Sequence, residues 1–353
     1  MGSKPMLFCD TKTVLTYMEA NFRFNLALKI PSIRTAEKAA PLVINRLELH
    51  RNRLIVNDTK YKMKVYRQCQ TSDRSKVEVG YDFDVQGFII GPVKSIQPGD
   101  TLFCHEDRHR EWLEHDCPER TSSLPCNHRI RLYVSGSMLE FPYENMKIYQ
   151  LMKRLLTIFI GNRRGEWIIK NFRPQDNVLR WPVDTRKPIV RHFEICTYFH
   201  NKLDGNQPII DTSVPLTTLE ISKIAIRIED HPFFKHVEHL MISDYPSPSS
   251  LSDLFSLQVP NVSITTPVLF DNRLDTSIRR LISKLMEKSL SIGVRYSILV
   301  KRKMNLTTIN HPKEIRKYKD AIRLAMGSDA IAVVRYSKRR SKTWLIIEVV
   351  AKN

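Results

Sequence analysis

Glycine is scarce in this sequence, with 11 copies among 353 residues, which is less than half of the share of about 7% in average proteins. Loops that cradle phosphate groups depend on glycine, because its backbone can approach a ligand closely. The sequence also contains no Gly-x-Ser-x-Gly, His-Glu-x-x-His or Gly-x-x-x-x-Gly-Lys-Ser/Thr motif, the marks of hydrolases, metalloproteases and nucleotide-binding loops. We therefore predict a protein without an enzymatic site.

Long apolar runs are absent as well, because none reaches the roughly 18 residues that a membrane-spanning helix needs. The first residues lack the apolar core of a secretory signal, and we expect no membrane contact. The six cysteines are then expected to be reduced thiols, since disulfides persist mainly in oxidising compartments. These features predict a cytoplasmic or nuclear location.

The composition is that of an ordinary globular protein, with 42% hydrophobic and 26% charged residues, which excludes long disordered regions. At about 150 residues per domain, the length suggests two or three domains. Lys and Arg outnumber Asp and Glu by 56 to 37, which gives a net charge of +19. From Arg295 to Asn353 alone, 15 basic residues stand against 4 acidic ones, so the excess is concentrated at the C-terminal end.

Hydrophobic periodicity predicts a mixed α/β fold. Its four segments are residues 1–40, a helical segment; 41–144, a β-rich region with a polar insertion at 97–128; 145–290, a body of stacked α/β units; and 291–353, a basic α/β segment. The first segment holds two or three short helices, the second of which is stopped by Pro31. A segment of this length buries little apolar surface by itself. It therefore needs a partner, or the rest of the chain, to be stable.

The second segment begins where the hydrophobic period changes to two. This alternation predicts antiparallel strands between residues 42 and 66, with a turn at Asn57-Asp58-Thr59. The third segment opens with a helix from Asn145 to Gly161, followed by a strand at residues 167–172. A helix followed by a glycine and a strand favours an α/β layer over a further meander.

Four short stretches of the third segment resemble one another. They are Phe193-Glu194-Ile195-Cys196, Leu219-Glu220-Ile221-Ser222, Leu240-Met241-Ile242-Ser243 and Val262-Ser263-Ile264-Thr265. A Leu-x-Ile strand that recurs after 20–29 residues is typical of leucine-rich-type stacking, in which each unit covers the apolar edge of its neighbour. Chance similarity among Leu- and Ile-rich strands is the alternative, because four-residue matches are common.

The end of the chain returns to regular patterns. They predict a helix at residues 275–288, a strand at 296–300, a second helix at 312–326 and two strands at 330–336 and 343–350. The predicted 312–326 helix would bury Ile315, Tyr318, Ile322 and Met326 on one face.

Residues 104–128 gather three of the six cysteines and four of the eleven histidines. Cys104, His109, Cys117 and Cys126 are the candidate metal ligands, because thiolates and imidazoles are the ligands that zinc prefers. Their spacing fits no known zinc module, and the stretch is rich in charged residues. We therefore predict no metal and no cofactor.

The basic excess raises the alternative of nucleic-acid association. Lys313, Arg316 and Lys317 lie on the predicted 312–326 helix, and Arg339 and Arg340 lie in a predicted hairpin tip, where they could contact phosphates. No zinc finger, aromatic RNP strand or basic zipper accompanies them, and a charged helix face is most often a solvated surface.

Two stretches resemble a known family. The first is Lys4-Pro5-Met6 with Thr13-Val14-Leu15-Thr16-Tyr17-Met18-Glu19-Ala20-Asn21-Phe22-Arg23 and residues 30–42, and the second lies within residues 152–172. They are similar to a nematode-expanded family of F-box C-related proteins with a domain of unknown function. The resemblance implies a short F-box-like helical head, a motif that docks on a Skp-type adaptor of a cullin ubiquitin ligase while the following domain holds a target protein.

The resemblance places five residues where an F-box-like pattern has its docking positions: Leu15, Met18, Arg23, Leu26 and Pro31. The family's usual Leu-Pro opening is replaced here by Met6-Leu7-Phe8-Cys9. The alternative is that the apolar members of the set simply pack onto the strands that follow Pro41. We therefore expect a protein-recognition function, as a substrate receptor with a Skp-type adaptor and an unknown target protein as partners.

Overall fold

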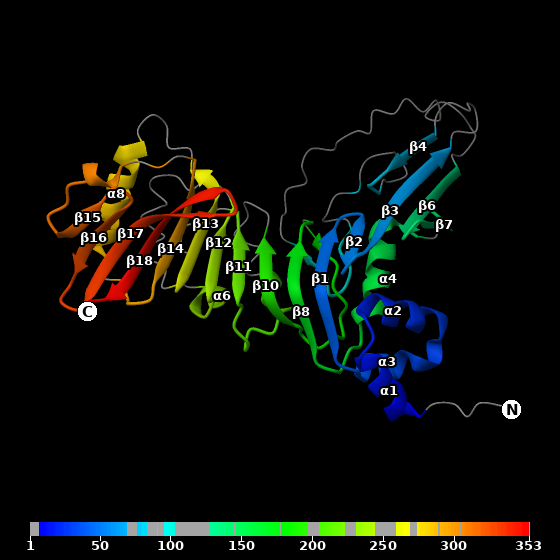
Figure 1. The fold of residues 1–353 in the computed structure, drawn as a ribbon. Coiled ribbons are helices and arrows are strands. Elements are labelled where there is room, and N and C mark those ends of the chain that lie inside the picture. Colours follow the sequence, from blue (N-terminus) through cyan, green and yellow to red (C-terminus); the bar gives the residue numbers. More distant parts are fainter. Residues whose placement is uncertain are drawn as a thin grey trace. The chain divides into compact units, whose positions relative to one another are not determined.

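The structure is a computed structural model, and it describes residues 7–68, 76–82, 90, 95–102, 127–143, 146–176, 178–195, 205–222, 231–243, 259–268, 274–288, 290–301, 303 and 305–352. The chain forms two compact units. The first consists of Met1–Arg191 and Phe199–Asp211, and the second of His192–Tyr198 and Thr212–Asn353. The boundary falls within strand β10 (Ile189–Ile195), which Figure 1 labels.

Short helices form the N-terminal head (residues 7–40), as predicted. They are α1 (Phe8–Thr16), α2 (Ala20–Lys29), the 3-10 turn η1 (Pro31–Ile33) and α3 (Arg34–Ala39). The Glu19 carboxylate caps α2 by accepting hydrogen bonds from the backbone N–H groups of Asn21 at 2.8 Å and Phe22 at 3.2 Å. Pro31 follows the last turn of α2 and begins η1, because proline cannot donate the hydrogen bond that would continue a helix.

Strands of the β-rich segment, together with a later strand at residues 167–174, form the sheet of the first unit. Its strands are β1 (Leu42–His50), β2 (Arg53–Val56), β3 (Thr59–Gln68), β4 (Lys76–Val79), β6 (Asn127–Val134), β7 (Ser137–Pro142) and β8 (Trp167–Pro174), with β5 (Thr101–Leu102) and β9 (Val178–Leu179) in a separate pair. β1 pairs antiparallel with β2 and parallel with β8. Asn57 lies in the turn between β2 and β3 with a φ of +52°, a conformation that asparagine tolerates.

Helix α4 (Ile148–Ile160) connects the head to this sheet (Figure 1). The ring of Phe159 on α4 stacks on Phe24 of α2, with the ring centroids 4.7 Å apart. The same ring meets Tyr61 of β3 at a centroid distance of 5.2 Å. The three aromatic residues are buried, so one core holds the head, α4 and the sheet together.

The second unit begins with parallel strands that carry the four self-similar stretches. These strands are β10, β11 (Thr218–Ile221), β12 (His239–Ile242) and β13 (Asn261–Val268), and β14 (Arg295–Val300) continues the parallel order after them. The pairing register aligns Phe193, Leu219, Leu240 and Val262, and two residues later Ile195, Ile221, Ile242 and Ile264. All eight side chains are buried, so the apolar positions of the stretches are stacked; kinship with leucine-rich repeats stays a prediction.

Helix α8 (Leu274–Glu287) follows β13 and buries the face that its periodicity predicts, including Ile278, Leu281 and Leu285. The short helix α6 (Pro232–Lys235) precedes β12, and the 3-10 turn η4 (Leu306–Thr308) follows β14. The remaining strands are β15 (Glu314–Tyr318), β16 (Ala321–Met326), β17 (Ala330–Arg339) and β18 (Lys342–Ala351), of which β18 pairs antiparallel with β14.

The predicted helix at residues 312–326 is wrong, because this stretch forms the antiparallel strands β15 and β16. Ile322, Leu324 and Met326 are buried while Arg323 between them is exposed, which is the period of two of a half-buried strand. Ile315 and Tyr318, which the helix would have buried, are 48% and 44% exposed. The described part of residues 291–353 thus contains strands and one 3-10 turn but no α-helix.

The mixed α/β fold class is confirmed by these elements, since helices and strands share both units. In the described ranges, no helix is both long enough and apolar enough to cross a bilayer.

Candidate protein-interaction site

The apolar residues predicted to dock a partner lie mostly inside the head. Leu15, with 1% of its surface exposed, forms a small core with Ala36 and Ala40. Met18 and Leu26 are partly buried against this core, so they offer a partner only part of their surface. The reason is that three short helices in this order must turn an apolar face toward one another to be stable at all.

Arg23 is also removed from the docking surface, because it is buried in an ion cluster. Its guanidinium donates a hydrogen bond to the Glu37 carboxylate at 3.0 Å, and the Arg163 guanidinium donates to the same oxygen. The Lys38 ammonium lies 3.4 Å from the other oxygen of this carboxylate. Three cations thus surround one carboxylate, and Arg23, Glu37 and Arg163 are almost completely buried.

Backbone carbonyl groups complete the coordination of these cations. Arg23 and Arg163 both donate to the carbonyl oxygen of Glu37, at 3.0 and 3.1 Å. Burial lowers the pKa of Arg23 to about 10 and that of Lys38 to about 8, and the charge of Arg163 adds to the lowering at both sites. The cluster therefore retains an excess of buried positive charge that one carboxylate only partly offsets.

Lys38 fastens the head to α4. Its ammonium donates hydrogen bonds to the carbonyl oxygens of Ile158 at 2.5 Å and Phe159 at 2.6 Å. Both carbonyls belong to the last turn of α4, where a cation is favourable because of the helix dipole. The head is accordingly an integral part of the first unit.

A different set of head residues is at the surface. Of the sixteen large hydrophobic side chains that are exposed in the described part of the chain, seven lie in the head: Leu7, Phe8, Val14, Tyr17, Phe22, Leu28 and Ile30. Tyr17 is 86% exposed and Phe22 58%. Of the five docking residues suggested by the resemblance, Pro31 is exposed in the same region.

The sequence could have indicated part of this set. Tyr17, which caps the end of α1, comes three residues after Val14, so the two side chains lie on one side that differs from the side of Leu15. Arg23 and Phe24 are among the buried residues of α2, whereas Phe22 is exposed. Nothing in the local pattern distinguishes Phe22 from Phe24, because the choice depends on where Phe159 lies.

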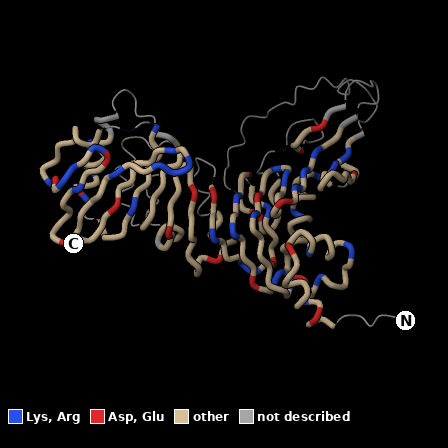
Figure 2. The backbone as a smooth tube through the Cα atoms, viewed as in Figure 1, with Lys and Arg blue, Asp and Glu red and all other residues tan. Residues whose placement is uncertain are grey.

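The residues of the nucleic-acid alternative do not form one patch. Lys313 precedes β15, and Arg316 and Lys317 lie on it, whereas Arg339 and Arg340 lie at the exposed turn between β17 and β18. Strand pairing places Arg316 level with Arg323 and Val333, six residues before Arg339. At about 3.3 Å per residue this is about 20 Å along the sheet. Figure 2 shows the hairpin tip as a separate stretch of basic residues.

The candidate ligands Cys104, His109, Cys117 and Cys126 lie outside the described residues. The structure instead brings together His192, Glu194 and Glu220, whose nearest ligand atoms all lie within 4.8 Å of one another. Glu194 and Glu220 are directly paired on β10 and β11, and their spacing of 26 residues gave no sign of this. Imidazole and carboxylate groups in this arrangement could hold a divalent cation.

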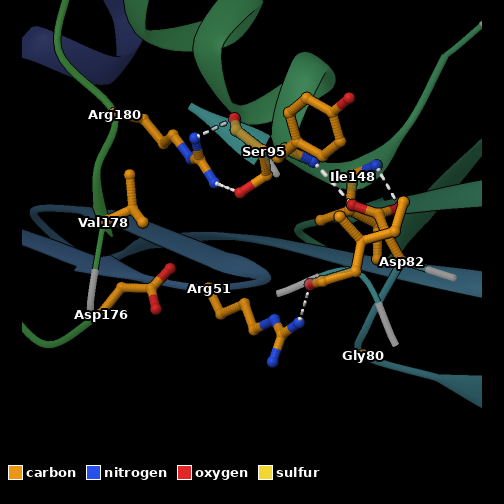
Figure 3. A pocket seen from close by; sticks show the side chains of 10 residues that line it. Arg51, Gly80, Asp82, Ser95, Ile148, Asp176, Val178 and Arg180 are labelled. Carbon is orange, nitrogen blue, oxygen red and sulfur yellow. Dashed lines mark hydrogen bonds between the residues drawn. The ribbon is translucent and has the colours of Figure 1, made fainter. Parts of the chain in front are cut away.

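A small cavity of about 50 Å³ lies beside the N-terminus of α4 (Figure 3). The Asp82 carboxylate accepts hydrogen bonds from the backbone N–H groups of Ile148 and Tyr149, so the helix end is already capped. Arg180 donates to the carbonyl and hydroxyl oxygens of Ser95, both at 2.6 Å. Ligand pockets usually have about 300–1,000 Å³, so this site has a structural role.

In a comparison with known protein families, one region of the chain matches a family model. A family model described as a domain of unknown function (DUF3557) matches residues 147–302, which begin at the cap of α4 and end just after β14. This match supports the presence of a domain of unknown function, and the F-box C-related resemblance is not confirmed by it. No curated protein and no solved structure matches the chain.

Proposed function

We propose that this chain is a non-enzymatic protein-recognition protein whose head docks on a Skp-type adaptor, so that the rest of the chain presents a target protein to a cullin ubiquitin ligase. The observation that supports the proposal is the concentration of exposed apolar side chains on a head that is firmly attached to the first unit. A receptor needs both properties, because it must bind the adaptor and hold the target in a fixed position.

The exposed side chains favour a protein surface as their partner. Full burial of a large apolar side chain contributes about 1.5–3 kcal/mol, so Val14, Tyr17 and Phe22 together could supply much of the free energy of a stable complex. Apolar residues on a short helix are the elements that helix-in-groove recognition uses. The docking residues that we propose are therefore Val14, Tyr17, Phe22 and Pro31, in place of the buried Leu15 and Arg23.

The experiment is isothermal titration calorimetry, in which a purified Skp-type adaptor is titrated into the purified intact chain. We expect binding by the native chain and a loss of at least tenfold in affinity for the double variant Y17A/F22A, which removes about 1.4 kcal/mol or more. The matched control is M138A/L139A on β7, which removes two apolar side chains that are 46% and 55% exposed elsewhere in the first unit. Absence of binding, or equal loss in both variants, would contradict the proposal.

Nucleic-acid association is the second candidate, and the hairpin tip favours it. Lys338, Arg339, Arg340 and Lys342 are all exposed in or beside the turn between β17 and β18. We expect any binding to duplex DNA or RNA to be weak and to vanish with salt, because such contacts act through counterion release. Tight binding at physiological salt that the K338A/R339A variant abolishes would favour this function over adaptor docking.

A further inference from the structure

A groove runs between the head and the segments that follow α4, all within the first unit. Its volume is about 920 Å³, which is in the range of sites that hold ligands. Its lining includes Phe8, Arg34, Ile158, Arg164, Asp184 and Arg186. They come from α1, α3, α4 and two connecting segments, so the fold assembles the groove from distant parts of the sequence.

Three guanidinium groups of this groove are exposed, and no carboxylate in the described part of the chain pairs with them. Arg34, Arg164 and Arg186 are exposed at the surface, and within the described residues none of them has an ion pair. The side chain of Arg34 is fixed in part, because its Nε donates a hydrogen bond to the carbonyl oxygen of Ala27 at 2.8 Å. Cations that converge on a concave surface raise the local concentration of anions.

The buried ion cluster adds to the positive electrostatic potential of the groove. Lys38 and Arg163 also line the groove, and their shared partner is the single carboxylate of Glu37. Among the lining residues and Glu37, five cations stand against the two carboxylates of Asp184 and Glu37, a net formal charge of +3. Buried charges are screened less by salt than exposed ones, so the floor adds a lasting positive potential.

The groove also has an apolar component. Phe8 is 50% exposed, and Ile158, which also lines the groove, is half-buried. A single inorganic anion would use only the cations and leave most of the volume empty. A peptide that alternates acidic and apolar side chains would use both, since arginine forks match carboxylates geometrically.

We propose that this groove binds an acidic peptide segment of a partner protein, with carboxylates on Arg34, Arg164 and Arg186 and an apolar side chain against Phe8 and Ile158. The proposal deepens the protein-recognition function by naming the chemistry of the target, and it rests on that function. It concerns residues other than the adaptor-docking set, so the two can fail separately.

The test uses the full-length chain and a fluorescein-labelled peptide in which Asp and Glu alternate with Leu and Phe. Fluorescence anisotropy should show saturable binding, and the variant R164E/R186E should lose at least tenfold in affinity. The control K60E/K170E makes the same change in net charge at two exposed lysines outside the groove lining, and it should change affinity less than threefold.

Three results would overturn the proposal. One is an equal loss in the groove variant and the control, which would indicate a long-range charge effect. Another is equal affinity for a peptide with Gln and Asn in place of Glu and Asp. The third is binding of inorganic phosphate or an inositol polyphosphate without binding of the peptide, which would assign the groove to a small anion.

The same variants separate this proposal from the adaptor proposal. R164E/R186E should still bind the Skp-type adaptor, and Y17A/F22A should still bind the acidic peptide. Loss of adaptor binding in Y17A/F22A with no peptide binding by the native chain would refute the groove proposal alone. Peptide binding without adaptor binding would refute the docking proposal alone.

Discussion

The head and the β17–β18 hairpin are both rich in cations, but they hold them in opposite environments. In the head, Arg23 is almost completely buried beside a carboxylate, whereas Arg339 and Arg340 are exposed, with no ion pair among the described residues. The buried cations depend on their partners, because an unpaired charge in the interior is unfavourable by several kcal/mol. The exposed cations depend on nothing but water, so only a partner molecule could give them a specific role.

This comparison shows why a net charge alone does not identify a function. A basic residue in a sequence can hold two elements together, as Lys38 does by its hydrogen bonds to the end of α4, or it can be an exposed surface charge. The largest basic excess lies in the C-terminal sixth of the chain, yet the cations that converge on a groove lie in the first unit.

The strongest way to break the comparison is to remove the one carboxylate of the buried cluster. Glu37→Gln keeps the shape of the side chain but leaves Arg23, Lys38 and Arg163 without their anion. We expect the first unit to lose about 3–5 kcal/mol of stability. Urea unfolding would be followed by fluorescence in a W112F/W344F background, in which the remaining tryptophans, Trp167 and Trp181, both lie in the first unit.

The matched control is Glu348→Gln in the second unit. Glu348 lies 3.9 Å from Arg295 and 3.5 Å from Arg335, and all three side chains are partly exposed. A surface pair of this kind contributes about 0–1 kcal/mol. Circular dichroism would follow unfolding of this variant. Equal losses of stability in the two variants would show that the buried cluster of the head stabilises the first unit no more than a surface ion pair does.

A second test compares the two phenylalanines of α2. Phe24→Leu removes the ring that stacks on Phe159 and should destabilise the first unit by about 1–2 kcal/mol, from lost packing and the lost aromatic pair. Phe22→Leu changes a side chain that is 58% exposed and should stay within about 0.5 kcal/mol. Measured by the same urea unfolding, a larger effect at Phe22 would reverse the assignment of the buried and the docking face.

The head and the C-terminal strands also differ in what their sequences reveal. The head helices carry local signals: Glu19 caps α2, and Pro31 ends it. The mixed fold and the amphipathic helices α4 and α8 are likewise visible from periodicity, because each helix buries one continuous face. These features depend on residues within one or two turns of each other, so a single sequence contains the information.

The stretch at 312–326 lacks such signals. Its apolar residues fit helical steps, but Ile322, Leu324 and Met326 also alternate, and pairing with β17 decides in favour of the strand. The candidate sites depend on contacts that are more distant still. Arg163 meets Glu37 across 126 positions, and the groove joins Arg34 to Arg164 and Arg186. No period or spacing predicts such encounters, since they follow from the packing of α3 against the end of α4.

A third test measures how the stability contribution of the buried Lys38 changes with pH. Burial lowers its folded-state pKa to about 8, against 10.5 for an unperturbed lysine, so between these two pH values the unfolded chain binds more protons than the folded one. Stability contributed by this site is therefore lowest below pH 8 and rises between pH 8 and about 10, by at most about 1.4 kcal/mol per pH unit.

The measurement compares urea unfolding of the native chain and of Lys38→Met between pH 7 and pH 10. Methionine cannot titrate, so the difference between the two curves isolates Lys38 from Arg23, whose own pKa is about 10, and from the charges of Glu37 and Arg163 that face it. A difference that stays constant with pH would show that Lys38 keeps an ordinary pKa and is not buried as the structure has it.

The smallest effect is expected at the hairpin tip. The double variant R339A/R340A would remove two exposed cations from the turn between β17 and β18. Arg340 and Ser341 in this turn have φ of +47° and +64°. Alanine tolerates such angles poorly, so the single substitution Arg339→Ala is the cleaner variant, and it should change the free energy of unfolding by less than about 0.5 kcal/mol. Its buried counterpart in the comparison, Arg23→Ala, should cost several times more, because it leaves Glu37 with fewer partners and opens a cavity. If thermal unfolding followed by circular dichroism gave both variants the same stability, the distinction between fastening and free cations would fail.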